Sequence, residues 1–344
     1  MKIFYKSIIQ IVPDKQFKIK ELKGDVDENI RELLDYIVSK REKREYEMIE
    51  GQGISSQVIA FAEALTASIE MEDIPDLDAL AGQMAGKYLE ATSKMGNRVK
   101  TGNLLIALLR DDCKKLQFIA AQIDNEGFFE SETFEKMSGF PDDNKKIWKT
   151  AVFRFAESPK ICVQQVFVDT KGQAKYWADT FLGLKVKRLS KENTDRAIKA
   201  VDRVLRENVG QVSEQDYAVL RFTFLHKMLR DGTDINYTEL IEELFENYVP
   251  RNQKFSAECV RHVKEELCKL PDKADFDTLF VTNASAVKPD TTVQKFEIDN
   301  GIELKLDWDV NPHDVISSDI DRTDGSKYIK IRCSDVVYKR FHKS

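Results

Sequence analysis

Cysteine and histidine are the first residue types to consider for nucleophilic or metal chemistry. The chain of 344 residues has five cysteines and four histidines, with no CxxC, HxxxH or HExxH spacing. Zinc sites need such clustered ligands, so we expect no metal site and no cofactor. The odd number and wide spacing of the cysteines predict reduced thiols, most of them packed as small hydrophobic side chains.

An acidic motif with a lysine lies nearer the carboxyl end. Pro289-Asp290 precedes Glu303-Leu304-Lys305 with twelve residues between them. The arrangement resembles the PD…ExK motif of metal-dependent nucleases, in which Asp and Glu oxygens hold Mg²⁺ and the Lys stabilises or activates the attacking water. Glu303 and Lys305 also fall where any amphipathic strand places its solvated side chains. Two hypotheses follow: a nuclease site of Asp290, Glu303 and Lys305, or an ordinary strand surface.

Glycine patterns offer little more. Gly51-Gln52-Gly53 resembles part of a phosphate-binding loop, but it lacks GK[ST] and no strand is predicted in front of it. GxSxG is absent, and no GxGxxG follows a predicted strand. The sequence therefore indicates no nucleotide cofactor and no serine nucleophile.

Positive charge is concentrated in two stretches of a chain whose formal net charge is −6. These are residues 145–188 and 327–343, while acidic residues gather at 69–78 and 234–247. Such segregation predicts a basic face on an acidic body, and each Lys or Arg on it could neutralise a phosphate of double-stranded DNA. The residues predicted to contact DNA are Lys185, Lys187, Arg188, Lys330, Arg332, Lys339 and Arg340.

Other interpretations of the charged segments stay open. Basic stretches are often ordinary solvated surfaces, and aromatic residues among lysines more often belong to the core than to base-stacking platforms. Trp177, which shares a helical face with Phe181 and Leu182, is expected in the core. The acidic helical segments could instead dock a protein partner or mimic nucleic acid.

The elements that must position these residues indicate an α+β protein. Residues 1–171 are predicted to form an α+β domain with an N-terminal antiparallel sheet, in which a strand at 2–12 pairs with the next segment as a hairpin. Helices are predicted at residues 25–48, 51–71 and 75–96. Two apolar hairpins follow at 102–124 and 145–170, and their near-continuous apolarity predicts strands covered on both faces.

The rest of the chain changes in character. Residues 172–271 are predicted to form a helical domain, with an apolar stripe from Ala197 to Leu205 and Ser213 as a helix cap. Residues 272–344 are predicted to hold a linker and then a C-terminal β-hairpin, because apolar and charged residues alternate strictly from Ile302.

No membrane or export signal is evident. The first residues read as a strand rather than a signal peptide, and no apolar stretch approaches the roughly 20 residues that span a bilayer. We therefore expect a cytoplasmic protein with no membrane partner. Exposed strand edges favour pairing with a second copy, so a homodimer is predicted.

Three stretches together resemble a known family. They are the hairpin at 102–124, "YWADTFLG" at 176–183, and "DNGIELKLDWDV" with "DGSKYIKIR" near the carboxyl end. In this order they are similar to the bacterial nucleoid-associated proteins of the NdpA/YejK type. The resemblance implies a cytoplasmic protein of the nucleoid that binds DNA without an enzymatic step, and it supplies no catalytic residues. Families of this kind also contribute components of bacterial anti-phage systems.

Overall fold

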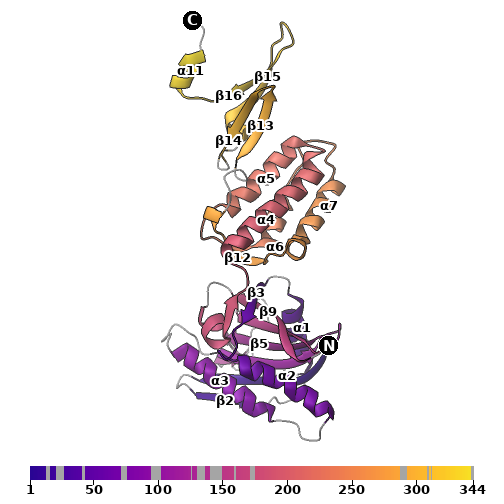
Figure 1. The fold of residues 1–344 in the computed structure, drawn as a ribbon, viewed down its shortest axis with the longest axis vertical. Coiled ribbons are helices and arrows are strands. Elements are labelled where there is room, and N and C mark those ends of the chain that lie inside the picture. The colour runs from indigo at the N-terminus through magenta and orange to yellow at the C-terminus, as the bar shows by residue number, and fades with distance from the viewer. Residues whose placement is uncertain are drawn as a thin grey trace. The chain divides into compact units, whose positions relative to one another are not determined.

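The structure is a computed structural model, in which the chain divides into two compact units (Figure 1). Unit 1 comprises Met1–Leu189 together with Asp277–Phe280, and unit 2 comprises Ser190–Phe276 together with Val281–Ser344. The structure describes residues 1–12, 16–20, 27–40, 43–70, 76–93, 102–124, 126–129, 136–139, 149–158, 160–170, 175–286, 293–307, 310 and 312–341.

Unit 1 is built on an antiparallel sheet with the strand order β10-β3-β9-β8-β5-β4-β1-β2. Its strands are β1 (Lys2–Val12), β2 (Gln16–Lys20), β3 (Arg44–Met48), β4 (Gly102–Arg110), β5 (Leu116–Asp124), β8 (Lys149–Ala156), β9 (Cys162–Thr170) and β10 (Leu184–Val186). Strands β4, β5, β8 and β9 are neighbours in chain order, and β1 pairs with β2, which confirms the predicted N-terminal antiparallel sheet. A separate hairpin joins β6 (Glu126–Phe129) to β7 (Lys136–Gly139).

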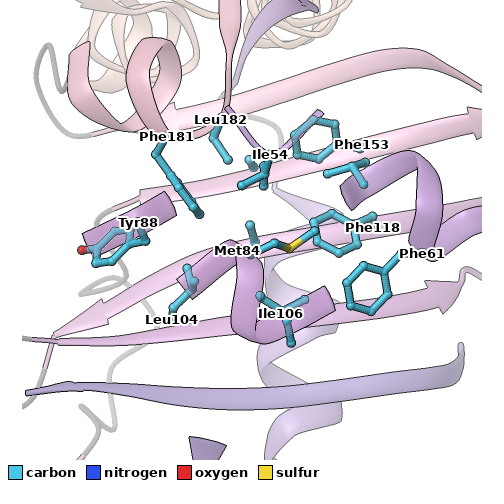
Figure 2. Packing of buried hydrophobic residues seen from close by; sticks show 14 of the residues in the cluster. Ile54, Phe61, Met84, Tyr88, Leu104, Ile106, Phe118, Phe153, Phe181 and Leu182 are labelled. Carbon is cyan, nitrogen blue, oxygen red and sulfur yellow. The ribbon is translucent and has the colours of Figure 1, made fainter. Parts of the chain in front are cut away.

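The central strands are buried on both faces, as their apolar sequences predict. The covering helices are α1 (Asp27–Ser39), α2 (Ser55–Glu70) and α3 (Leu77–Ser93). Alternate residues of β4 starting at Leu104 pack with α2 and α3, whereas those starting at Leu105 pack with α1. Figure 2 shows the first cluster, in which Phe61 and Met84 from the helices meet Phe118 of the sheet.

A π-helix, η3 (Tyr176–Phe181), follows β9 and adds aromatic side chains to this cluster. Trp177 is fully buried, as predicted, and its ring centroid lies 5.0 Å from that of Phe181. Gly183 (φ +69°) then meets Gly53 (φ +51°) backbone to backbone, and a Cβ on Gly53 would stand 2.3 Å from Gly183 N. Gly53 is therefore needed because two chain segments touch there and leave no room for a side chain.

The segment after α1 differs from its prediction. The sequence predicts that a helix continues to Met48, but α1 ends at Ser39 and Arg44–Met48 form β3. Tyr46 packs against the core, whereas its neighbours Glu45 and Glu47 point to the opposite face. This alternation from one residue to the next is typical of a strand. Pairing with β9 on one edge and β10 on the other outweighs the helical propensity of a Lys- and Glu-rich sequence.

Unit 2 begins with the predicted helical region. Its helical elements are α4 (Ser190–Leu205), η4 (Arg206–Gly210), α5 (Glu214–Met228), α6 (Tyr237–Glu246), α7 (Ala257–Cys268) and α8 (Leu270–Ala274). The stripe from Ala197 to Leu205 is buried along α4, and the Ser213 hydroxyl accepts a hydrogen bond from Asp216 N, which confirms the predicted cap of α5. Short strands β11 (Asp234–Asn236) and β12 (Leu279–Val281) and the 3₁₀ turn η5 (Ala284–Ala286) complete this part of the chain.

Small hairpins end the chain, as the sequence predicts. The elements are β13 (Gln294–Asp299), β14 (Ile302–Leu306), α10 (Pro312–Val315), β15 (Ile316–Ile320), β16 (Lys327–Ile331) and α11 (Asp335–Phe341). The second hairpin, β15 with β16, is one that the sequence pattern reveals only in its closing strand. Upstream, the passage expected to be a linker contains the buried side chains of Phe276, Asp277 and Phe280. Helices and sheet strands together confirm the α+β class.

The cysteines are placed differently from expectation. All five lie in the described part of the chain, and none of them forms a disulfide. Packing as small hydrophobic side chains is wrong for most of them, because Cys113, Cys162, Cys268 and Cys333 are exposed. Cys113 lies in the turn between β4 and β5, and Cys162 is the first residue of β9. Both therefore lie at strand ends, outside the apolar core.

Candidate nucleic-acid interface

Lys185, the first of the predicted DNA contacts, lies on the edge strand β10. It stands opposite Glu47 of β3, and its Nζ lies 3.1 Å from Glu47 Oε2. The two side chains are 61% and 48% exposed. An ion pair this exposed contributes at most about 1 kcal/mol, so Lys185 can exchange Glu47 for a phosphate at little cost.

Lys187 and Arg188 share the carboxylate of Glu45. Lys187 Nζ lies 2.8 Å from Glu45 Oε1, and Arg188 Nη1 lies 2.7 Å from Glu45 Oε2 and 2.9 Å from Asp277 Oδ1. The side chain of Lys187 is 39% exposed, whereas that of Arg188 is only 10% exposed. Arg188 is thus held inside unit 1 by two carboxylates, and it could meet DNA only by breaking its ion pairs with both of them.

Lys330 and Arg332 lie at the C-terminal hairpin. Lys330, 66% exposed, pairs through Nζ with Asp319 on the neighbouring strand, and this hydrogen bond lowers the pKa of the Asp319 carboxyl. Arg332 follows β16, where its backbone N–H donates to Val315 O at 2.8 Å while its side chain is exposed. Both cations therefore lie at the surface of unit 2.

Lys339 and Arg340 occupy the last turn of α11, a helix without a buried residue. Cations are favoured there by the partial negative charge of a helix C-terminus. Residues 327–341 contain five basic residues and a single acidic one, Asp335. We name residues 327–341 the basic C-terminal segment, and its charge and exposure are those of a phosphate-contacting surface.

The alternative nuclease residues can be placed only in part, because Asp290 lies outside the described residues. Glu303 and Lys305 share the solvated face of β14, with Glu303 Oε2 3.4 Å from Lys305 Nζ and exposures of 44% and 59%. Among the described residues, no group of three or more His, Cys, Asp and Glu side chains could hold a metal ion. Glu303 and Lys305 thus occupy the positions that an ordinary amphipathic strand would give them, and the nuclease stays a hypothesis.

Part of the acidic surface of α6 is neutralised within unit 2. Glu243 Oε2 lies 2.9 Å from Lys227 Nζ, and Glu242 pairs with Lys264. These side chains are largely exposed, so the pairs are weak. A protein partner for the acidic helices stays a prediction.

One group of cations could not be predicted from the sequence. Lys40, Lys43 and Arg154 come from separate elements, yet they line one depression of unit 1 together with Phe167 and Asp169. The pairing of β8 with β9 and the end of α1 bring them together, and no local pattern encodes either contact. The alternation of β8 alone could have shown that Arg154 faces the same side as Thr150 and Val152.

The described residues include no helix with the length and apolarity needed to cross a bilayer. No curated protein and no solved structure matches the chain. A family model does match, over residues 162–322, and it describes the nucleoid-associated protein YejK. The matched region runs from β9 through the helices of unit 2 into the C-terminal hairpins, and it contains the "YWADTFLG" stretch. Over these residues the chain is similar to the nucleoid-associated protein YejK, in agreement with the resemblance found in its sequence.

Proposed function

We propose that this protein binds double-stranded DNA through sequence-independent contacts to the phosphate backbone, in the cytoplasmic nucleoid and without catalysing a reaction. The family match supports a nucleoid-associated role. The observation that carries the proposal is the exposed basic C-terminal segment, which contains five basic residues and one acidic residue. Backbone binding of this kind needs clustered positive charge and no base-reading element.

The proposed contacts are a subset of those predicted from the sequence. Lys330, Arg332, Lys339 and Arg340 would contact phosphates from unit 2, and the exposed amines of Lys185 and Lys187 would do so from unit 1. Arg188 is left out, because its guanidinium is already bound by Glu45 and Asp277.

A homodimer is proposed as the binding form. The C-terminal hairpin leaves apolar side chains exposed, with Ile320 at 56% and both Ile329 and Ile331 at 46%. A two-stranded hairpin is marginally stable by itself in water, so a second copy that covers this face would stabilise it and double the number of phosphate contacts. Participation in an anti-phage system is a further prediction that rests on the family resemblance alone.

Titration of duplex DNA at two salt concentrations tests the proposal. Six phosphate contacts predict a slope of about −5 for the logarithm of affinity against the logarithm of salt concentration, which is a loss of roughly 1,000-fold between 50 and 200 mM salt. The double substitution Lys339→Gln/Arg340→Gln should reduce that slope by about 2.

The matched control is Lys199→Gln/Arg203→Gln on α4, which removes the same charge elsewhere on unit 2. It should leave the slope unchanged, and two unrelated duplexes of equal length should bind alike. Affinity that does not respond to salt, or an equal loss in both double variants, would contradict the proposed interface.

A further inference from the structure

Exposed apolar side chains gather near the carboxyl end of the chain. Of the thirteen large hydrophobic residues that are exposed in the described part of the chain, ten lie between Ile298 and Phe341. Eight of these ten belong to the β15–β16 hairpin and to α11, which are labelled in Figure 1. Monomeric soluble proteins rarely expose large apolar patches, and such patches mark sites of contact with another molecule.

The β15–β16 hairpin has one apolar face and one polar face. Directly paired residues point to the same side of a sheet, and side chains alternate along each strand. One face, which we name the isoleucine face, therefore consists of Ile316, Ser318, Ile320, Lys327, Ile329 and Ile331. Ser317, Asp319, Tyr328 and Lys330 point to the opposite side. Lys330, a proposed phosphate contact, thus stays accessible when the isoleucine face is covered.

Helix α11 is also amphipathic. At about 100° per residue, Val337, Tyr338 and Phe341 fall within roughly a third of the helix circumference, and we name these three residues the α11 stripe. Lys339 and Arg340 lie on the other side of the helix. No residue of α11 is buried within the chain itself, and a helix of seven residues is marginal in water without packing. Packing of the α11 stripe on a partner surface would stabilise the helix and leave both cations outside the contact.

The isoleucine face and the α11 stripe are together large enough for a specific interface. Their exposed side chains leave on average about half of their surface open to solvent. Taking about 200 Å² for a large side chain, each copy offers roughly 600 Å² of apolar surface. Two copies would bury about 1,200 Å², which reaches the lower end of the range for stable interfaces.

Charge at the margins of the two surfaces is complementary. Lys327 is the only charged residue on the isoleucine face, and Asp335 is the only acidic residue of α11. Opposite charges at the rim of an apolar contact favour that pairing over others.

We propose that two copies of the chain exchange α11, so that the α11 stripe of each copy packs on the isoleucine face of the other. These are the contact surfaces of the homodimer proposed above, and the exchange rests on that proposal. A second copy is the occupant because both surfaces are exposed within a single chain, which therefore does not cover one with the other. Each copy supplies one face and one helix, so a two-fold axis closes the dimer. Lys330, Lys339 and Arg340 of both copies point away from the buried surfaces and stay available for phosphates.

Sedimentation equilibrium of the full chain tests the exchange. Wild type should have twice the monomer mass of 39.6 kDa. Ser318→Asp on the isoleucine face and Val337→Asp on the α11 stripe should each raise the dissociation constant of the dimer at least about tenfold, because each places a carboxylate in an apolar contact. Ser317→Asp and Val336→Asp are the matched controls, since they add the same charge on the opposite side of the same element. Both controls should dimerise like wild type.

Mixing the two variants distinguishes the exchange from other dimers. In the mixture, the intact helix of Ser318→Asp can pack on the intact face of Val337→Asp. Dimers should therefore reappear, with a dissociation constant between that of wild type and those of the separate variants. Far-UV circular dichroism shows whether each variant is folded. No recovery on mixing, or equal effects of the variants and their controls, would overturn the exchange.

The titration of duplex DNA gives an independent result. Wild type that sediments as a monomer would overturn the exchange together with the homodimer, while salt-dependent binding of duplex by that monomer would leave the phosphate contacts in place. A dimer that shows recovery on mixing but binds no duplex would support the exchange and contradict only the DNA proposal.

Discussion

Arg188 and Asp277 meet inside unit 1, although 89 positions separate them in the chain: Arg188 Nη1 donates to Asp277 Oδ1 at 2.9 Å. The Asp277 side chain is 2% exposed, and its Oδ1 also accepts from Glu45 N at 3.1 Å. Thr278 adds a hydrogen bond from Lys43 N at 2.8 Å. These bonds attach residues 277 and 278 to the start of β3.

Substitution of Arg188 should therefore change stability rather than DNA affinity. Arg188→Gln removes the cation that Glu45 and Asp277 share, and breaking buried ion pairs of this kind costs about 3–5 kcal/mol. Urea unfolding measures it, with Lys185→Gln as the control, for which at most about 1 kcal/mol is expected. A folded Arg188→Gln protein with wild-type stability and weakened DNA binding would instead make Arg188 a DNA contact.

The contact between Gly53 and Gly183 should not tolerate a side chain. Gly53→Ala adds a Cβ that would stand 2.4 Å from Phe181 O, so the backbone must move in addition to the strain of a positive φ. Gly51→Ala is the matched control, because its φ is +73° but nothing lies within 4 Å of its added Cβ. We expect a loss of about 1–2 kcal/mol for Gly51→Ala and a clearly larger loss for Gly53→Ala, measured by thermal or urea unfolding. Equal losses would show that the close approach does not exist.

Asp216 should make stability depend on acidic pH. Burial acts to raise the pKa of this carboxyl, but hydrogen bonds from Arg251 N, Ser213, Tyr248 and Asn252 N outweigh it and lower the pKa. Because the folded pKa lies below the unfolded value, the stabilisation is complete above the ordinary Asp pKa of about 4 and is lost as pH falls through the lowered pKa. Urea midpoints measured from pH 6 downward should fall less steeply in Asp216→Asn than in wild type. Parallel curves would assign the acid sensitivity to other groups.

The nuclease hypothesis predicts a different result from the one we expect. Supercoiled plasmid incubated with the protein and Mg²⁺ should stay intact, and Glu303→Ala should behave like wild type. Nicking by wild type that Glu303→Ala abolishes would establish the metal-dependent site and displace the non-catalytic proposal.

The elements that the sequence predicts well are those whose buried apolar residues follow one another closely or recur at helical spacing. Strands β4 and β5 are covered on both faces, so their apolar runs leave little ambiguity, and α4 has a single buried stripe. Strand β3 could not be predicted, because Arg, Glu and Lys dominate a short segment whose partners lie far along the chain. Local alternation of two apolar residues is too weak a signal there.

The candidate site likewise contains features that depend on local sequence and features that depend on contacts between distant residues. The exposure of Lys339 and Arg340 could be expected from the local sequence, since both lie in a stretch rich in basic residues. The engagement of Arg188 and the gathering of Lys43 with Arg154 depend on strand register and on the return of residues 277–280, which are non-local. Counting charges along a sequence cannot separate a cation that is held by carboxylates from one that is available.

The return of Asp277–Phe280 to unit 1 makes Ser190–Phe276 an insertion whose two ends both join the same body. A single proteolytic cut near residue 189 therefore leaves residues 277–280 of unit 1 on the carboxyl-terminal fragment, and the two fragments should stay associated. Expression of residues 1–189 alone removes the hydrogen-bond partners of Lys43 and Glu45 and exposes Arg188, so that fragment should precipitate unless residues 277–280 are supplied as a peptide or fused to its end.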